Sequence, residues 1–364
     1  MMIPDSPQEL TVEWLTEALQ SSGVLEQSTI TEFTIEVMSD EQGVTGQLAR
    51  IQVDYVAASG SLSQSIIAKF PTADPQVREF IFTVTRHYQR EIQFYEQVAD
   101  KVSLRIPQLY YSDLDVEARK SILLIEDLSP ARVLDKSIGC PPEDAEVAIR
   151  EIARLHADWW EHETLPELAK IAFDNPPFAQ QMQSLYQESW EPFCARMGER
   201  LPANFVQTGK QIGKHLASIH GQLQNSPQTL LHRDFQLGNV MFAPAGANHP
   251  PIFIDWQLMS VGRGPQDVAY FLSSNVTLEE RRRVENDLLD IYFTVLKENG
   301  ILDYPFEQCL IDYRLALCKA FGDIVVSSAR ANLSEAQANL TYGIIAPRQI
   351  AAILDQDAGS LLPS

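Results

Sequence analysis

The 364-residue chain is longer than one hydrophobic core usually supports, which favours two domains. Its 45% hydrophobic content is typical of a globular protein and argues against disorder. Aspartate and glutamate number 49 against 28 lysine and arginine, a formal net charge of −21, and so acidic a surface repels nucleic acid and anionic membranes. The acidic excess favours solubility, and it could attract a cationic substrate if it were concentrated at a cleft.

The cysteines and the hydropathy pattern exclude further classes. The four cysteines are scattered, with no Cys-x-x-Cys pair, which argues against a disulfide framework and against a zinc site. The first residues, MMIPDSPQELTVEWL, lack a basic region followed by an apolar run. No apolar stretch approaches the ~20 residues that cross a bilayer. We therefore expect a cytoplasmic protein that binds neither nucleic acid nor membrane.

The first 126 residues predict a small antiparallel sheet with helices. A helix is expected over 11–22, where Val12, Leu15 and Leu19 share one face. Apolar and polar residues alternate in three segments that read as strands: 31–38, 48–56 and 63–70. A helical segment over 74–101 follows, and then two further strands are expected at 104–114 and 121–128. The polar, proline-containing sequence EDLSPAR then predicts a boundary, so residues 1–126 are expected to form an N-terminal lobe.

Residues 127–364 predict a mainly helical second lobe. Helical periodicity is clear in four segments: 141–162, 204–223, 277–300 and 306–332. Thr277 and Glu280 have the spacing of a capping box at the start of the third. Only one β interruption is expected, a hairpin of two short strands over residues 239–257.

Three polar features of this second lobe are expected to be structural. His156 lies on an amphipathic helix beside Trp159, a pattern that usually indicates core. His232 is expected to support the loop that follows it. The run ERRRV, residues 280–284, is expected to form a solvated helix face.

The residues that carry chemistry lie in LLHRDFQLGNVMF and PIFIDWQ. Phosphoryl transfer from ATP needs a carboxylate that orients the attacking hydroxyl, together with oxygen ligands that hold Mg²⁺ on the phosphates. The loop supplies Asp234 as the candidate base and Asn239 as one metal ligand, and the hairpin brings Asp255 as the other. The alternative is a buried polar loop that only satisfies its own backbone.

These motifs, with GPQDVAYFL, resemble the aminoglycoside phosphotransferase and choline kinase superfamily, and most closely its ecdysteroid-kinase-like branch. The resemblance extends from about residue 31 to the final helices. It implies an α+β, protein-kinase-like fold of two lobes, with an antiparallel sheet plus helix in the first and a catalytic β-hairpin in the helical second. It also implies that Asp267 buttresses the catalytic loop. One departure is Arg233, which stands where these families usually have glycine.

The N-terminal lobe should hold the nucleotide. Lys69, at the end of a strand, fits the lysine that contacts the α and β phosphates, and Glu91 is its expected partner because REIQFYEQ resembles the family's helix. Glu96 on the same helix is the rival. Two glycines, Gly43 and Gly46, lie between the first two strands and either cover the triphosphate or only form a turn.

The segment IEDL, residues 125–128, should be the hinge whose backbone, at positions such as Glu126 and Leu128, hydrogen-bonds adenine. The alternative is a strand end whose acidic residues face water. Because Asp-Phe-Gly and Ala-Pro-Glu are both missing, and because only 12 positions separate Asp255 from Asp267, the sequence leaves no room for the activation loop of a protein kinase.

The sequence therefore predicts an ATP- and Mg²⁺-dependent kinase that phosphorylates a small hydroxylated molecule. The acceptor stays open. A cation would suit carboxylates such as Asp312 or Asp323, whereas a bulky, sterol-like alcohol would suit an apolar pocket lined by Trp190, Tyr292 or Phe321. A catalytically inactive, nucleotide-binding scaffold is the alternative function.

Overall fold

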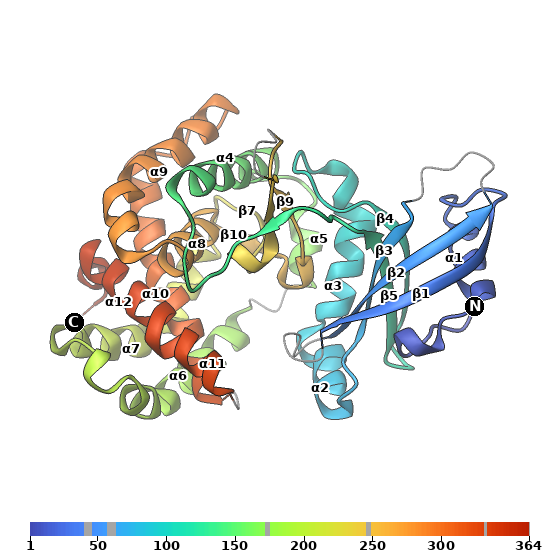
Figure 1. The fold of residues 1–364 in the computed structure, drawn as a ribbon. Helices are drawn as coiled ribbons and strands as arrows, with labels where there is room; N and C mark the ends of the chain where they lie inside the picture. Colours follow the sequence, from blue (N-terminus) through green and yellow to red (C-terminus); the bar gives the residue numbers. More distant parts are fainter. Residues whose placement is uncertain (40–45, 57–62, 172–174, 245–248, 331–332, 364) are drawn as a thin grey trace. The chain divides into compact units, whose positions relative to one another are not determined.

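A computed structural model describes residues 1–39, 46–56, 63–171, 175–244, 249–330 and 333–363, which fall into two compact units (Figure 1). The N-terminal unit consists of Met1–Lys101, Ile106–Ala131 and Ile254–Gln257. The helical unit consists of Val102–Arg105, Arg132–Phe253 and Leu258–Ser364. The short segment 254–257 therefore belongs with the sheet of the first unit, although it lies far along the sequence.

The N-terminal unit is built on one antiparallel sheet of five strands in the order β1-β2-β3-β5-β4. All five strands lie where alternation predicted them: β1 Thr29–Ser39, β2 Gly46–Val56, β3 Ser65–Pro71, β4 Leu109–Asp115 and β5 Lys120–Glu126. The cross-strand partners Leu48 and Lys69, and likewise Arg50 and Ile67, fix the register of β2 against β3. This register determines which side chains of the two strands face the core.

Helix α1, Val12–Ser21, covers one face of the sheet, and Figure 1 shows α3, His87–Gln93, on the other side. The α1 helix begins at Thr11, whose side chain accepts a hydrogen bond from the Trp14 N–H. Its core positions and the inward residues of the sheet are almost completely buried together: Leu15, Leu19, Ile51, Val53, Ile66, Ala68, Ile122 and Leu124. Because side chains alternate across a strand, Lys69 projects from the opposite face.

The predicted single helix over 74–101 is interrupted. Helix α2, Pro75–Phe80, begins at Asp74, whose carboxylate accepts the N–H groups of Gln76 and Val77, and a π-helical turn follows. Arg86 has a left-handed φ of 54°, which ends this stretch before α3 begins. Periodicity alone could not reveal the break, since the apolar spacing continues through it.

The helical unit contains the predicted long helices and several shorter ones: α4 Pro142–Asp158, α5 Leu165–Ala169, α6 Pro176–Met197, α7 Val206–Leu223, α8 Pro265–Asn275, α9 Leu278–Glu298, α10 Phe306–Arg330, α11 Glu335–Ala338 and α12 Ala346–Asp355. Helix α10 packs against α6, α7, α8 and α12, and α4 packs against α9. None of the described helices combines the length and apolar character that a membrane crossing requires.

The prediction of only one β interruption in this unit is wrong. The expected hairpin is present as β8, Val240–Phe242, and β9, Ile252–Phe253, and β6, Arg132–Val133, pairs with β8. A second small sheet joins β7, Thr229–Leu231, to β10, Ser260–Gly262. Strands of two or three residues are too short for alternation to be visible, yet β7 and β10 hold together the segments that lead into the loop at 232–239 and into α8.

The predicted solvated face at 280–284 is also wrong at two residues, because Arg281 and Val284 are both buried. Arg281 is fully buried, pairs with Glu285 at 2.5 Å and also with Asp355 at the end of α12. Tyr313 donates its hydroxyl to the same Glu285 at 2.7 Å. The packing of α12 and α10 over α9 therefore encloses an arginine that the local sequence places on a surface.

The α1–sheet core yields a stability prediction. Leu19→Ala should lower the free energy of unfolding by about 2–5 kcal/mol, because Leu19 is fully buried and the sheet cannot collapse into the cavity. Glu17→Ala, an exposed change on the same helix, should stay within about 0.5 kcal/mol of the parent. Chemical denaturation measures both, and equal stability of the two variants would contradict the assigned role of α1.

Candidate active site

Lys69 forms the centre of a charged cluster in the N-terminal unit. Its Nζ lies 2.5 Å from Glu91 Oε1 and 3.2 Å from Asp255 Oδ1. Burial alone would lower the pKa of Lys69, but the charges of Asp255 and Glu91 raise it to a net value above the usual range. The lysine is therefore a fixed positive charge. Glu96, the rival partner, is exposed and accepts a hydrogen bond from the Ser112 hydroxyl at 2.8 Å.

Asp255 is held in place by its two following neighbours. The Trp256 ring stacks on Phe94 with centroids 3.9 Å apart and planes 5° from parallel, and the Trp256 N–H donates to Glu91. Gln257 donates its side-chain amide to Asp255 Oδ2 at 3.1 Å. Asp255 itself has a φ of 65°, a left-handed conformation that costs a non-glycine residue roughly 1–3 kcal/mol. The stacked rings and the ion pairs stabilise that strained backbone.

The loop between β7 and β8 carries Asp234 and Asn239. The side-chain nitrogen of Asn239 donates to the Asp234 carbonyl at 2.9 Å and to Asp234 Oδ2 at 2.8 Å. Gln236 donates to the same Oδ2 at 3.0 Å. The Tyr270 hydroxyl also hydrogen-bonds Asp234, and burial together with the Asp234 charge raises the pKa of Tyr270 well above its usual value. The carboxylate is thus oriented by amide and hydroxyl donors on its own loop and on α8.

Asp267, at the start of α8, ties this loop to the helical core. It is almost fully buried and accepts the backbone N–H groups of His232 and Arg233, each at 2.8 Å. His156 Nε2 lies 3.3 Å from the same carboxylate, and its Nδ1 lies 3.0 Å from the Tyr292 hydroxyl. Burial alone would raise the pKa of Asp267, but the His156 hydrogen bond and charge, with the His232 N–H, lower it overall.

The backbone conformation of Arg233 is one that glycine adopts more easily than other residues. Its φ is 68°, in the left-handed region that glycine adopts without a steric penalty. The Asp267 carboxylate accepts the Arg233 N–H and so stabilises this conformation. The guanidinium reaches α10, where Nη1 lies 3.7 Å from Asp323. The departure from the family pattern therefore keeps the backbone shape and adds a charged side chain beside Asp234.

The remaining nucleotide-site candidates lie in the N-terminal unit or outside the described residues. Gly43 lies outside them. Gly46 opens β2 opposite Pro71, and a Cβ added there would lie 2.8 Å from the Phe70 carbonyl oxygen, so a close backbone approach already requires glycine. The Glu126 N–H donates to the Gln108 carbonyl at 2.9 Å, and the Leu128 carbonyl accepts from Ala131 at 2.9 Å.

Asp255 and Asn239 are the candidate ligands for magnesium, a metal that prefers oxygen ligands. The Asp255 carboxylate is 24% exposed, and the nitrogen end of the Asn239 amide is committed to Asp234, which makes the Asn239 oxygen the end that can coordinate a metal. Each residue, considered in its own unit, therefore offers an oxygen of the kind that Mg²⁺ prefers. No group of three or more His, Cys, Asp or Glu side chains in the described part of the chain is arranged to hold a metal by itself.

Several residues around these groups were not foreseen as functional. His156 had been expected to be ordinary core, and nothing in its helix indicates a contact with Asp267, which is 111 residues away. Tyr270 could have been found, because it lies three residues after Asp267 on one helix and therefore on the same side. The stacking of Phe94 on Trp256 had no local signal.

Comparisons with known proteins support the same fold. The Ecdysteroid kinase-like family model matches residues 41–302. A candidate aminoglycoside phosphotransferase from Ralstonia eutropha JMP134 is 13% identical with a TM-score of 0.56, covering 96% of this chain and 99% of that one. An ethanolamine kinase from Plasmodium vivax is 10% identical with a TM-score of 0.52, covering 94% and 87%. The GDP complex of aminoglycoside 2'-phosphotransferase-IIIa is 12% identical with a TM-score of 0.52, covering 93% and 99%.

A comparison with curated proteins found no match. The structural likenesses confirm the predicted protein-kinase-like α+β fold, and the family match confirms the predicted resemblance. At sequence identities of 10–13%, the solved structures show only that the fold is similar.

The hydrogen bonds that the Asp267 carboxylate accepts predict a defined pH dependence of stability. Asp267→Asn should lower the free energy of unfolding at pH 7 by roughly 3 kcal/mol, because the carboxylate accepts charge-assisted hydrogen bonds that an amide cannot replace. The folded pKa of Asp267 lies below its unfolded value of about 3.9, so this contribution is present above that pH and is lost as pH falls through the folded pKa.

The stability difference between wild type and Asp267→Asn should therefore shrink below about pH 4. Denaturant titrations from pH 7 to pH 3 measure it. Asp290→Asn, an exposed change on α9, is the matched control and should show almost no difference at any pH. A difference for Asp267→Asn that stays constant over this range would show that its carboxylate is not ionised in the folded protein.

Proposed function

Because this chain belongs to the ecdysteroid kinase-like family, we propose that it is an ATP- and magnesium-dependent phosphotransferase that moves the γ-phosphate onto a hydroxyl of a small molecule. The observation that carries the proposal is Lys69 bound between Glu91 and Asp255. A lysine held between two carboxylates is a strong cation poised for phosphate oxygens. A cluster that only stabilised the fold would not require Asp255 to be partly exposed to solvent.

In this proposal, Lys69 binds the α and β phosphates of ATP, with Glu91 fixing its position. Leu128 offers its backbone N–H to the adenine ring from the hinge, and Glu126 lies at the start of that segment. Gly43 and Gly46 belong to the connection that would cover the phosphates. Each of these residues is contributed by the N-terminal unit.

Asp255 and Asn239 are the proposed magnesium ligands. Bound Mg²⁺ would neutralise charge on the phosphates and so lower the barrier to transfer. Asp255 has a second function before the nucleotide binds, since it shares the positive charge of Lys69. Asn239 fixes the carboxylate of Asp234 by its nitrogen while its oxygen is kept for the metal.

Asp234 is the proposed base. Its carboxylate orients the acceptor hydroxyl and accepts the proton as the oxygen attacks phosphorus. The donors from Asn239, Gln236 and Tyr270 hold it in one orientation, which is what a positioning role requires. Asp267 and His156 maintain the loop and do not touch the reacting atoms.

The acceptor is proposed to be a neutral alcohol. The two carboxylates that could have met a cation are already paired: Asp312 binds Arg263 at 2.6 Å, and Asp323 binds Lys319 at 3.1 Å. Trp190, Tyr292 and Phe321 are buried in the core, so they do not line an open apolar pocket. An ATP-consumption screen of sugars, sterols and amino alcohols tests this, and a strong preference for the amino alcohols would contradict it.

The second candidate function is an inactive nucleotide-binding scaffold. Asp234 would be dispensable in such a protein, because it meets the acceptor and not the nucleotide, and the hydrogen bond that Asn239 donates to its carboxylate at 2.8 Å supports a positioned base. Mg²⁺-dependent ATP turnover distinguishes the two.

Asp234→Asn should reduce turnover by about 10²–10⁴-fold while ATP affinity stays nearly unchanged, because this carboxylate meets the acceptor and not the nucleotide. Steady-state kinetics and calorimetric ATP binding measure the two effects. Equal turnover by wild type and variant would favour the scaffold, and a loss of ATP binding by a folded variant would show that the division of roles is wrong.

Asp255→Ala should abolish the advantage that Mg²⁺ gives to ATP binding and reduce turnover by on the order of 10³-fold, because it removes a metal ligand. Calorimetry of ATP binding with Mg²⁺ and with EDTA compares the two states for each protein. If Mg²⁺ strengthened ATP binding equally in wild type and Asp255→Ala, Asp255 would not be a metal ligand.

A further inference from the structure

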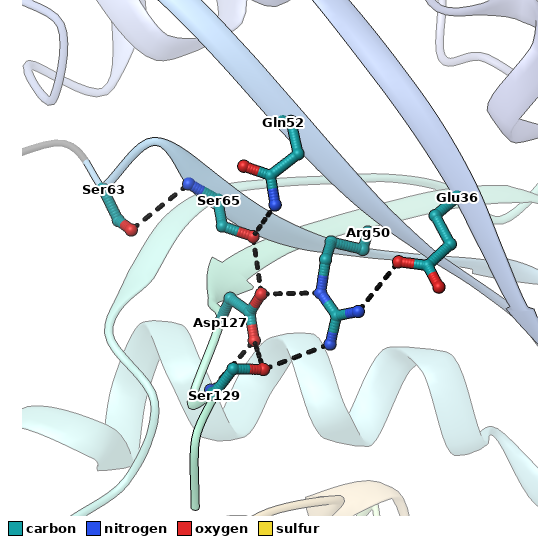
Figure 2. A pocket seen from close by; sticks show the side chains of 7 residues that line it. All are labelled: Glu36, Arg50, Gln52, Ser63, Ser65, Asp127 and Ser129. Atoms are coloured by element: carbon teal, nitrogen blue, oxygen red, sulfur yellow. Dashed lines mark hydrogen bonds and ion pairs between the residues drawn. The ribbon is translucent and has the colours of Figure 1, made fainter.

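A polar hollow of about 390 Å³ lies entirely within the N-terminal unit, and Figure 2 shows its side chains. Its lining comes from three strands and from the segment after β5, and it is polar throughout: Glu36, Arg50, Gln52, Ser65, Asp127 and Ser129. Arg50 lies at the centre of this group. Apart from Asp127, which lies in the predicted hinge, these residues have no function predicted from the sequence.

The strand register places the hollow on the same sheet face as Lys69. Leu48 lies opposite Lys69, and Arg50 lies opposite Ile67, so these side chains project on one side. The intervening residues Ala49 and Ala68 are buried in the core under α1. Ile67 and Lys69 are two residues, roughly 7 Å, apart along β3. A nucleotide whose phosphates meet Lys69 can therefore extend its ribose and base along this face toward Arg50.

The guanidinium of Arg50 is fixed along its edges. Its Nε donates to Asp127 Oδ2 at 2.8 Å, Nη1 donates to Glu36 Oε2 at 2.8 Å, and Nη2 donates to Ser129 Oγ at 3.1 Å (Figure 2). Edge contacts of this kind leave the flat faces of a guanidinium as its contact surface. The Arg50 side chain is 24% exposed, which is enough for a ligand to reach it.

Asp127 is the anchor of this arrangement. It directly follows Glu126 of the hinge and also accepts the Ser65 hydroxyl at 2.5 Å and the Ser129 N–H at 3.0 Å. Burial alone would raise the pKa of Asp127, but the donors on Ser65, Ser129 and Arg50 lower it to about 2. An ionised Asp127 thus holds β2, β3 and the hinge segment together at neutral pH.

The charges of the hollow select the ligand chemistry. Two carboxylates, Asp127 and Glu36, surround one guanidinium, so the cluster carries net negative charge and does not favour a phosphate. A neutral ring that stacks on the guanidinium and offers hydrogen-bond donors to Glu36 fits it. The base and ribose of a nucleotide have both properties.

We propose that Arg50, clamped by Asp127, stacks on the purine base of the bound nucleotide, and that Glu36 accepts a hydrogen bond from the nucleoside. This inference rests on the proposed kinase function and deepens it. Preorganisation by three edge contacts means that little side-chain entropy is lost on binding. The rival reading is that the cluster only fastens two strands to the hinge.

The test compares binding of MgATP and MgGTP with binding of magnesium tripolyphosphate, which carries the phosphates without a nucleoside. Arg50→Ala should weaken the binding of both nucleotides by roughly tenfold, which is the loss expected when one stacking contact with the base is removed. Binding of tripolyphosphate should not change. Arg50→Lys keeps the charge but not the plane, so it should recover little nucleotide affinity. Calorimetry on the full chain measures all of these.

Arg119→Ala is the matched control. Arg119 lies in the same unit and makes two hydrogen bonds to Glu79, at 2.8 and 3.2 Å, but it precedes β5 at the end opposite the hinge. It should leave nucleotide affinity unchanged. The unfolding midpoint of each variant is measured in parallel, and Arg50→Lys keeps the test valid if Arg50→Ala fails to fold.

Nucleotide affinity that is unchanged in both Arg50 variants would overturn the inference, and so would an equal loss for tripolyphosphate. Full recovery by Arg50→Lys would also overturn it, because charge alone would then explain the contact. A wild-type chain that binds neither MgATP nor MgGTP would instead overturn the proposed function itself. The two failures are therefore distinguishable.

Discussion

One lysine shared by two carboxylates is the constraint on which the N-terminal unit depends. Lys69 on β3 binds Glu91 on α3 and Asp255 on the segment 254–257, so three parts of the chain meet at a single cation. Without Lys69 the two carboxylates would repel each other in a site where water screens them little. In the proposed function, a metal ion would be a second cation able to pair with the Asp255 carboxylate. The arrangement is therefore stable in itself and still able to accept a charged ligand.

The loop that carries Asp234 in the helical unit is held in a similar way, by a buried carboxylate instead of a lysine. A single buried carboxylate, Asp267, accepts two consecutive backbone N–H groups and the His156 ring, and thereby fixes Arg233 in a left-handed conformation. Asp255 in the other unit has the same backbone conformation, stabilised by the ring of Trp256 on Phe94. At both motif positions, contacts with residues distant in the sequence therefore stabilise a backbone conformation that local preference disfavours.

The sequence predicted what is local. The strands of the sheet follow from alternation, helix α1 follows from Val12, Leu15 and Leu19 on one face, and His-x-Asp with a following Asn indicated the loop. Contacts between distant residues could not be predicted, as the pairing of Arg50 with Asp127, 77 positions away, illustrates. Short strands such as β7 carry no periodicity, and the burial of Arg281 depends on where α12 packs. Tertiary packing decides each of these, and no pattern within one segment records it.

Several acidic side chains of this chain are paired with basic ones. Asp312 and Asp323 in the helical unit, and Glu91 and Asp127 in the N-terminal unit, are each engaged by an arginine or a lysine. A carboxylate that is already paired exerts a weak attraction on a distant cation, because the neighbouring positive charge cancels most of its field. The pairing of these four carboxylates argues against a cationic acceptor at their own positions, whereas the net charge of −21 is carried by other acidic residues and favours solubility. In the proposed function, recognition of a neutral acceptor would then depend on shape and on hydrogen bonds around Asp234.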